Sequence, residues 1–257
     1  MHAKKHLDDI STTAPDFLDK DNIKDETDLL VEKIDNYQNI MYAQGKYSLL
    51  IILQGMDASG KDGAVRHIFS GVNPMGCSVV SFKGPTEEEL AHDYLWRIHQ
   101  HTPKKWMIQI FNRSHYEDIL VPTVEELLPQ EVIDKRYEHI NNFEKLLTDH
   151  DTIVLKFYLH ISSKEQKKRL KERMEDPHKY WKHNDDDWDS RKKWDDYMDV
   201  YDSIFARCNE IPWHIIPSDD NRYKVNQIAK VIVETFEGLD LKWPDLETDD
   251  DDDDDKA

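Results

Sequence analysis

The most constraining feature of this sequence is a short apolar run that leads directly into a loop containing glycine and lysine. Residues 49–53 are all Leu or Ile, and the loop is Gly55-Met56-Asp57-Ala58-Ser59-Gly60-Lys61-Asp62-Gly63. The apolar run predicts a buried strand, and the amphipathic residues 65–72 predict a helix after the loop. The order strand, loop, helix with the spacing G-x4-G-K is typical of a phosphate-binding loop.

The residue types of the loop explain why it would bind an anion. Glycine lets the backbone curl until its N–H groups converge, and the following helix presents its positive N-terminus. Lys61 adds a mobile cation for bridging phosphates. A glycine turn that binds nothing is the alternative, but G-x4-G-K arises by chance only roughly 0.1 times in a chain of this length. We therefore expect phosphate contacts from the loop residues Gly55, Met56, Ala58, Ser59, Gly60, Asp62 and Gly63.

The loop departs from the common pattern at the position after the lysine. The Ser or Thr that usually ligates Mg²⁺ there is replaced by Asp62, while Asp57 places another carboxylate inside the loop. Hard cations prefer oxygen ligands. Asp57 is therefore the first candidate metal ligand, and Mg²⁺ is the expected cofactor.

Composition limits the classes of function that the chain suits. A length of 257 residues fits one α/β domain with appendages, or at most two small domains. The net charge of −19 disfavours binding to nucleic acid, and the longest aliphatic run is far below the ~20 residues that span a bilayer. Two distant cysteines and the absence of a signal pattern indicate a reduced, cytoplasmic protein.

Strands and helices alternate along the chain. We expect an arm at 1–22, a kinase domain at 23–247 and a disordered acidic tail at 248–257. After the first strand, apolar runs predict further strands at 77–82, 106–111, 152–160 and 213–217. Apolar periodicity and capping signals predict helices at 25–44, 86–101, 130–149, from 163 to a break at 176–177, from 194 to 208, and at 223–236.

This alternation implies a parallel sheet covered on both faces. With the phosphate loop, it predicts an α/β P-loop kinase whose five-stranded parallel sheet is flanked by helices. A basic helix followed by a polar excursion lies between the fourth and fifth strands. We expect this segment, residues 162–195, to form a helical lid.

Phosphoryl transfer requires a cradle, a metal held by carboxylates, and cations that neutralise the transferred group. The third predicted strand ends at Phe111 and leads into Asn112-Arg113, and Glu117 and Asp118 follow. Ligands of open α/β sheets bind at the carboxyl ends of strands, so one of these two acids is the candidate second metal ligand. The alternative is an acidic helix N-terminus that only complements the helix dipole.

Four further basic residues are candidates for phosphate contacts. Arg113 could hold a phosphate bidentately, although a surface ion pair explains it equally well. Arg169 and Arg173 share one helix face and could close over a polyanion, whereas a basic helix face is usually just solvated. Lys83, at the end of the second strand, is either a phosphate contact or a solvated surface charge, as for Arg169 and Arg173. Trp181, Trp188 and Trp194 are either a platform for a base or, as we favour, packing residues.

Six motifs of this chain resemble the polyphosphate kinase 2 family. They are the loop at 55–63, Ser-Gly-Val-Asn-Pro at 70–74, Ser-Phe-Lys-Gly-Pro at 81–85, Phe-Asn-Arg-Ser-His-Tyr-Glu-Asp at 111–118, Arg-Leu-Lys-Glu-Arg at 169–173 and Trp-Asp-Asp-Tyr-Met at 194–198. The resemblance implies a Mg²⁺-dependent P-loop kinase that moves a phosphoryl group between inorganic polyphosphate and a nucleotide under a helical lid.

The resemblance also implies roles for individual residues. Asp57 and Lys61 would be the catalytic pair of the loop, Asn112 and Arg113 would stand in the Walker-B-like signature, and Arg169 with Arg173 would guide polyphosphate. Many members have Asp where Asn112 stands, which leaves Asp57 with Glu117 or Asp118 as direct metal ligands. Pro122-Thr123 replaces a stretch expected to contain Arg, so one polyphosphate contact is missing from the pattern.

Asn112 together with Glu117 and Asp118 resembles the subgroup that accepts both AMP and ADP. The expected partners are thus polyphosphate, adenine nucleotides with guanine nucleotides as further candidates, and other copies of the chain in a homo-oligomer. One alternative function is an ATP-dependent nucleoside monophosphate kinase of the thymidylate-kinase kind. Another is a P-loop module that binds nucleotides without turnover.

Overall fold

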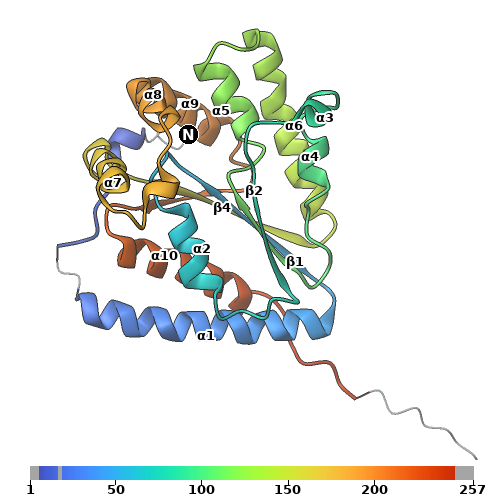
Figure 1. The fold of residues 1–257 in the computed structure, drawn as a ribbon. Helices are drawn as coiled ribbons and strands as arrows, with labels where there is room; N and C mark the ends of the chain where they lie inside the picture. Colours follow the sequence, from blue (N-terminus) through green and yellow to red (C-terminus); the bar gives the residue numbers. More distant parts are fainter. Residues whose placement is uncertain (1–5, 17–18, 247–257) are drawn as a thin grey trace, which may run out of the picture.

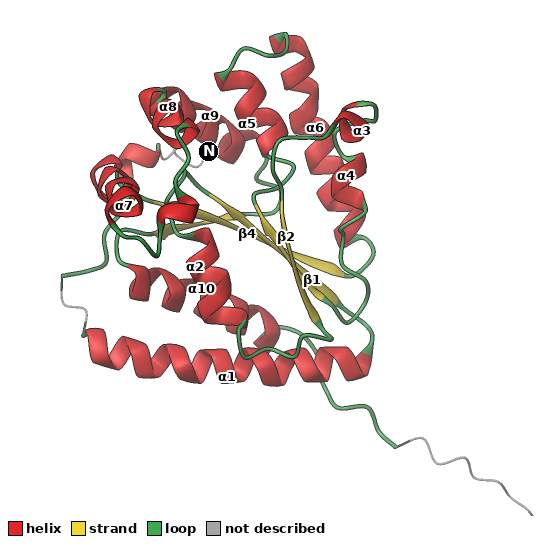
Figure 2. Ribbon diagram, in the orientation of Figure 1, coloured by secondary structure: helices red, strands yellow, loops and turns green. Residues whose placement is uncertain are grey.

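The computed structural model describes residues 6–16 and 19–246, and its centre is a five-stranded, all-parallel sheet (Figure 2). The strand order is β2-β3-β1-β4-β5. The strands are β1 (Ser48–Gln54), β2 (Cys77–Ser81), β3 (Ile108–Asn112), β4 (Thr152–His160) and β5 (Trp213–Pro217). This confirms the predicted α/β architecture, because central strands of a parallel sheet are buried on both faces and therefore read as continuous apolar runs.

The strand register brings the polar ends of the central strands together. Leu53 of β1 pairs with Asn112 of β3, and Asn112 pairs with Ser81 of β2. On the other side of β1, Gln54 pairs with Tyr158 of β4. The loop after β1 therefore starts at the edge of the sheet where Arg113 and the following residues leave β3.

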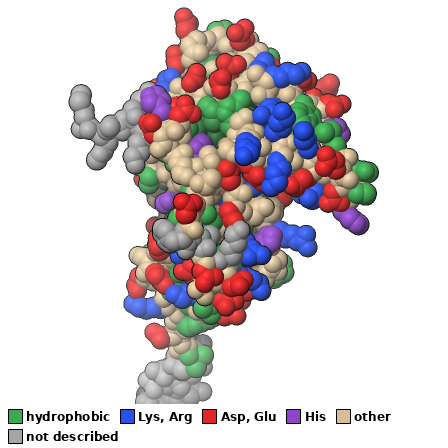
Figure 3. All heavy atoms as spheres, turned by 90° about the vertical axis from the view of Figure 1, so that its left-hand side faces the viewer, with side chains coloured by type: hydrophobic (Ala, Val, Ile, Leu, Met, Phe, Trp, Pro, Cys, Tyr) green, Lys and Arg blue, Asp and Glu red, His purple; other side chains and the backbone are tan. Residues whose placement is uncertain are grey.

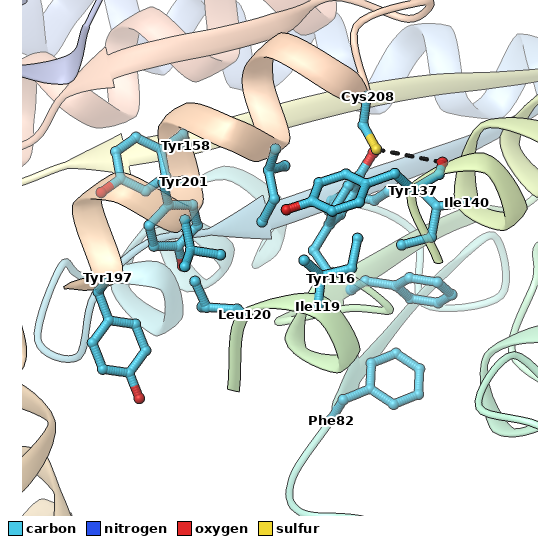
Figure 4. Close-up of a cluster of buried hydrophobic side chains, with 14 of the residues drawn as sticks. Phe82, Tyr116, Ile119, Leu120, Tyr137, Ile140, Tyr158, Tyr197, Tyr201 and Cys208 are labelled. Atoms are coloured by element: carbon cyan, nitrogen blue, oxygen red, sulfur yellow. Dashed lines mark hydrogen bonds between the residues drawn. The ribbon is translucent and has the colours of Figure 1, made fainter. Parts of the chain in front are cut away.

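Helices cover both faces of the sheet, as Figure 1 shows. One face packs against α1 (Lys20–Gln44), α2 (Lys61–Phe69) and α10 (Asn221–Glu237). The other packs against α5 (Glu117–Val124), α6 (Gln130–Thr148) and α9 (Trp194–Arg207). The aromatic side chains Tyr116, Tyr158 and Tyr201 are buried in this second core (Figure 4).

A buried ion network ties β4 to α6 within the second core. Nζ of Lys156 lies 2.8 Å from Oε2 of Glu144, 3.0 Å from the Tyr116 hydroxyl and 3.0 Å from the Cys208 carbonyl oxygen. Oε1 of Glu144 accepts from the Tyr116 hydroxyl at 2.7 Å and lies 3.2 Å from Nε2 of His115. His115 and Tyr116 come shortly after β3. The network therefore anchors the segment that carries Asn112 and Arg113 to α6 and β4.

The predicted helix at 86–101 is wrong, because two short helices occupy this segment. They are α3 (Glu87–Leu90) and α4 (Trp96–His99). The Thr86 capping box is present, but the Asp93 side chain accepts from the Leu95 backbone N–H at 3.0 Å. Such a local side-chain bond competes with the helical ladder and explains the interruption.

Other element ends also differ from the prediction. The first helix begins at Lys20 instead of about residue 25, because the Asp19 side chain accepts from the N–H groups of Asp21 and Asn22. The polar connection at 177–190 contains η2 (Tyr180–Lys182) and the start of α8 (Asp186–Lys192), after α7 (Ser163–Glu175). These three helices make up the segment proposed as a lid.

The described part of the expected arm packs against the body of the protein. A short 3-10 helix, η1 (Leu7–Asp9), buries Leu7, whose N–H donates to Asp202. The Thr12 carbonyl oxygen accepts from the N–H of Asp219 at 3.0 Å. The expected tail at 248–257 lies outside the described residues. Within 6–16 and 19–246, no helix combines the length and apolar character needed to cross a membrane.

Candidate active site

The loop between β1 and α2 requires glycine at two positions. Gly55 has φ 146°, and a Cβ there would lie 2.8 Å from the Leu159 carbonyl oxygen of β4. Gly60 has φ 95°, and a Cβ there would lie 2.1 Å from Nζ of Lys224. Both positions combine a left-handed backbone with a close neighbour, so any side chain would be strained. The glycines thus allow neighbouring groups to approach the loop closely.

Lys61, the first residue of α2, is buried against the loop that precedes it. Its Nζ donates to the carbonyl oxygens of Gly55 at 2.7 Å and of Met56 at 3.3 Å. Burial, and next the positive charge of Arg113, lower the pKa of Lys61. A cation held this way becomes more favourable when an anion arrives, as expected for a residue that meets phosphate.

Arg113 and Asp57 face each other across the site. Arg113 has φ 63°, which turns the chain sharply as it leaves β3, and its Nη2 lies 2.5 Å from Oδ1 of Asp57. Burial opposes the charge of Arg113, but Glu117 and Asp57 raise its pKa above the ordinary value. The backbone strain is typical of a functional position.

Asp62 links the loop to β3 and to the lid segment. Its Oδ1 accepts from Nδ2 of Asn112 at 2.7 Å, and its Oδ2 lies 3.3 Å from Nζ of Lys182 in η2. Burial opposes ionisation of Asp62, but the hydrogen bond from Asn112 and the charge of Lys182 lower its pKa. Asn112 therefore reaches the loop through its amide.

The structure separates the two acids that follow β3. Glu117 accepts from Nε2 of Gln54 at 2.9 Å, next to the start of the loop. Asp118 instead pairs with Nη2 of Arg97 at 3.0 Å, and burial raises its pKa despite that partner. It does not line the cavity described below. The expectation that Asp118 ligates a metal with Asp57 does not fit this geometry, because Arg97 holds its carboxylate outside the cavity that Asp57 lines.

Arg169 and Arg173 are not a solvated helix face. Arg169 is 12% exposed and donates to four backbone carbonyl oxygens, those of Ala58, Ser59, Ser218 and Asp219, at 2.8–3.2 Å. Arg173 is 19% exposed, and its Nη1 lies 2.5 Å from Oδ2 of Asp187 in α8. Arg169 therefore braces the phosphate loop, while Arg173 holds two parts of the lid segment together.

These residues surround a cavity of about 1020 Å³. Nine basic side chains line it: Lys61, Lys83, Arg113, Lys168, Arg169, Arg173, Lys179, Lys182 and Lys224. Six acidic side chains line it as well: Asp57, Asp62, Glu165, Glu172, Asp186 and Asp187. Positive charge thus prevails in the cavity, although the chain carries −19. Figure 3, a view from the side where α7 lies, shows Lys and Arg side chains gathered on the upper part of that face. We call this space the cationic cavity.

The cavity contains residues whose roles were open or unrecognised. Lys83 is exposed at its wall, and Trp181 is 77% exposed there, whereas Trp194 packs partly buried against the second core. Lys224 lies on α10 and was missed, because a single lysine in a first helical turn carries no motif. The only sequence signal was its position after the last strand, at the carboxyl edge of the sheet.

The carboxylates of the site suit a metal that is shared with a substrate. Among the residues that the structure describes, no group of three or more His, Cys, Asp or Glu could hold a metal ion alone. Mg²⁺ commonly binds through one or two carboxylates together with substrate phosphates and water. Asp57 belongs to the loop, lines the cavity and offers such an oxygen.

Comparisons with known proteins agree with this geometry. The model of the family described as polyphosphate kinase 2 matches residues 17–242. An AMP/ADP-polyphosphate phosphotransferase of Meiothermus ruber is 47% identical over 86% of this chain and 83% of that protein. An ADP-polyphosphate phosphotransferase of Rhodopseudomonas palustris is 39% identical over 84% of this chain and 79% of that protein. The crystal structure of polyphosphate kinase 2 from Arthrobacter aurescens TC1 superimposes with a TM-score of 0.92 at 35% identity, covering 97% of this chain and 91% of that one.

Proposed function

The chain belongs to the polyphosphate kinase 2 family, and on that premise we propose that it transfers a phosphoryl group between inorganic polyphosphate and AMP or ADP. The observation that carries the proposal is the cationic cavity around the phosphate loop in an otherwise acidic protein. Such a cavity concentrates polyanions that the rest of the surface repels. The family relatives named for AMP and ADP support both acceptors.

The reaction breaks a phosphoanhydride bond of the polymer and forms one to a phosphate oxygen of the nucleotide. The attacking oxygen is largely deprotonated near neutral pH, since the second pKa of a phosphate monoester is about 6. The site therefore needs no strong general base. Its tasks are to align the two substrates and to stabilise the charge of the group in transfer.

Lys61 and Arg113 supply that stabilisation in our proposal. Both line the cationic cavity, one at the start of α2 and the other just beyond β3. Arg113 can hold two oxygens of the moving group with its planar guanidinium. The loop N–H groups would hold the neighbouring phosphate of the donor.

Asp57 is the proposed ligand of Mg²⁺, with the remaining positions left to substrate phosphates and water. The metal would neutralise charge on the phosphates between which the group moves. Asp62 keeps its carboxylate ionised nearby through Asn112 and Lys182, so it can bind water of the metal or position Asn112. Glu117 does not line the cavity, but its negative charge, held by Gln54, acts on Arg113 from the start of α5.

A donor assay tests this function. AMP or ADP is incubated with polyphosphate and MgCl₂ without ATP, and nucleotides are separated by chromatography. We expect ADP and ATP from AMP, ATP from ADP, and loss of turnover with EDTA. Formation of product only when ATP replaces polyphosphate would instead identify an ATP-dependent nucleotide kinase.

We also propose that guanine nucleotides are accepted and that the protein acts as a homo-oligomer in the cytoplasm. The same assay with GMP and GDP tests the first point. Light scattering after size-exclusion chromatography tests the second, and fractionation of the producing cells tests the third.

A further inference from the structure

Lys224 is a deeply buried cation that the proposed transfer step does not use. It lies in the first turn of α10 and is 1% exposed. Its Nζ donates to the Ser59 carbonyl oxygen at 3.1 Å and to Oδ1 of Asn221 at 2.7 Å. An ammonium group has three donors, so these two contacts leave one N–H for a further acceptor. The side chain lines the cationic cavity.

The surroundings of Lys224 lack the carboxylate contact that normally accompanies a buried lysine. In the described ranges, 6–16 and 19–246, Lys224 forms no ion pair within 4.0 Å. The charged groups that face it are Arg169 from α7, Lys61 from α2 and Asp220 just before α10. A buried cation near two other cations is costly unless an anion joins it. An incoming anion is therefore the missing partner.

Gly60 gives this cation direct access to the phosphate loop. A Cβ on Gly60 would lie 2.1 Å from Nζ of Lys224 and 3.5 Å from Nη1 of Arg169. Both cations also bond the Ser59 carbonyl oxygen. The absent side chain thus leaves two positive groups next to the backbone of the loop.

The sheet order places Lys224 away from Lys83. The phosphate loop follows β1, with β3 and β2 on one side and β4 and β5 on the other. Lys83 follows β2, whereas Lys224 follows β5, and Arg169 bonds the backbone of the connection after β5 at Ser218 and Asp219. The β5 side of the loop, with Arg169 and Lys224, suits a chain of phosphates, and the β2 side is left for the other substrate.

We propose that Lys224 binds a phosphate of the donor chain other than the one being transferred, next to the positive charge of Arg169, whose own N–H groups are bonded to the loop and to the connection after β5. Lys224 would thereby be a specificity-determining residue for the polymeric donor. This inference rests on the proposed function. It adds where the polyphosphate donor would lie, which is on the β5 side of the loop at Lys224.

The protonation state of Lys224 should make the affinity for polyphosphate depend on pH, and this dependence can be measured. Burial first, and then the charges of Arg169 and Lys61, lower the pKa of Lys224 to about 7, while Asp220 opposes the shift. A bound phosphate would raise that pKa, so donor binding takes up a proton. By linkage, the affinity for polyphosphate falls as pH rises above about 7, where the free enzyme has lost the proton that the complex retains.

The test compares Lys224→Met and Lys224→Arg with Lys230→Met. Lys230 lies on the same helix but pairs with Glu26 at 2.8 Å outside the cavity, so it is a matched control. The KM for polyphosphate and for ADP is measured from pH 6 to 9 for each variant, with melting temperatures.

We expect Lys224→Met to raise the KM for polyphosphate at pH 6.5 at least tenfold, to change the KM for ADP less than threefold, and to lose most of the pH dependence between 7 and 9. The control should keep the wild-type profile, which includes the titration of the polymer itself. If Lys224→Met unfolds, Lys224→Arg decides, since its permanent charge should flatten the rise in KM above pH 7.

An unchanged KM for polyphosphate in a folded Lys224→Met protein would overturn the inference, as would equal increases for polyphosphate and ADP. A rise in KM above pH 7 that Lys224→Arg retains would overturn it too. Wild-type turnover in the same assay tests the proposed function separately, because an inactive wild type contradicts that function and not only the role of Lys224.

Discussion

Nη2 of Arg113 lies 2.5 Å from Oδ1 of Asp57, which joins the residue after β3 to the phosphate loop after β1. Both side chains are partly exposed, so the pair itself contributes little to stability. The two residues of the pair matter for the reaction: Arg113 is the proposed phosphate contact, and Asp57 is the proposed metal ligand. Binding of a metal and a phosphate would therefore replace one short ion pair by two sets of contacts.

Arg113→Lys should reduce kcat about 10²–10³-fold while the melting temperature stays within a few degrees. Lysine keeps the charge but loses the planar fork that holds two oxygens of the moving group. Steady-state kinetics with polyphosphate and ADP measures the effect. Arg207→Lys is the control. Nη1 of Arg207 lies 2.6 Å from Oδ1 of Asp134 in an exposed ion pair, and neither residue lines the cavity. Equal kinetics of both variants would contradict the role of Arg113.

Lys61→Met should lower kcat/KM by about three orders of magnitude or more, the equivalent of about 3–5 kcal/mol of transition-state stabilisation. Stability to urea should not fall, because burial already disfavours the charge of Lys61 and methionine fills similar space. Activity within tenfold of the wild type would show that Lys61 does not meet the transferred group.

Arg169 and Arg173 should respond differently to replacement by alanine. Arg169→Ala removes a donor from four backbone carbonyl oxygens, of which only that of Ser59 keeps another one, from Lys224, and should cost about 2–3 kcal/mol of unfolding free energy. Arg173→Ala removes a pair within the lid segment and should mainly raise the KM for polyphosphate, at least tenfold at low salt. The effect of Arg173→Ala on the KM for polyphosphate should shrink as salt rises.

Urea titrations and kinetics at two salt concentrations separate these effects. If Arg173→Ala keeps its KM for polyphosphate at low salt with an unchanged melting temperature, the polymer does not pass this part of the lid. A stability of Arg169→Ala equal to that of the wild type would show that water replaces its contacts.

The buried Glu144 should make the free energy of unfolding fall as the pH is lowered into the acidic range. Burial alone would raise its pKa, but the hydrogen bond from His115 and the charge of Lys156 outweigh burial and lower it. A lowered folded-state pKa contributes stability that is present above the ordinary value of 4.5 and is lost as pH falls through the folded-state value. Urea unfolding between pH 3.5 and 7 measures this loss.

Glu144→Ala should cost about 3–5 kcal/mol at pH 7, because Lys156 stays buried without its carboxylate. It should also weaken the dependence of stability on pH in the acidic range. Glu131→Ala, at an exposed position of the same helix, is the control and should change stability by about 0.5 kcal/mol or less. A Glu144→Ala protein as stable as this control would show that the ion network is dispensable.

Much of the fold followed from local patterns. The bounds of β4 and β5 were predicted to the residue, and the start of α6 was correct, because runs of apolar residues and their period report burial directly. The interrupted helix at 86–101 was not foreseeable from periodicity, since the side chain of Asp93 competes with the helical hydrogen bonds. The phosphate loop was recognised from spacing alone, because its glycines, its lysine and the following helix are contiguous.

The sequence by itself determined the class of fold, the phosphate loop and the family, since each depends on residues that are neighbours along the chain. Only the tertiary structure decided the partners of the charged side chains. Asp118 pairs with Arg97, Arg169 reaches carbonyl oxygens about 50 and 110 positions away, and Lys224 meets Ser59 across 165 residues. The reason is physical: a charge takes the partner that is closest in space within a low-dielectric interior, and that distance is set by how the sheet brings remote segments together.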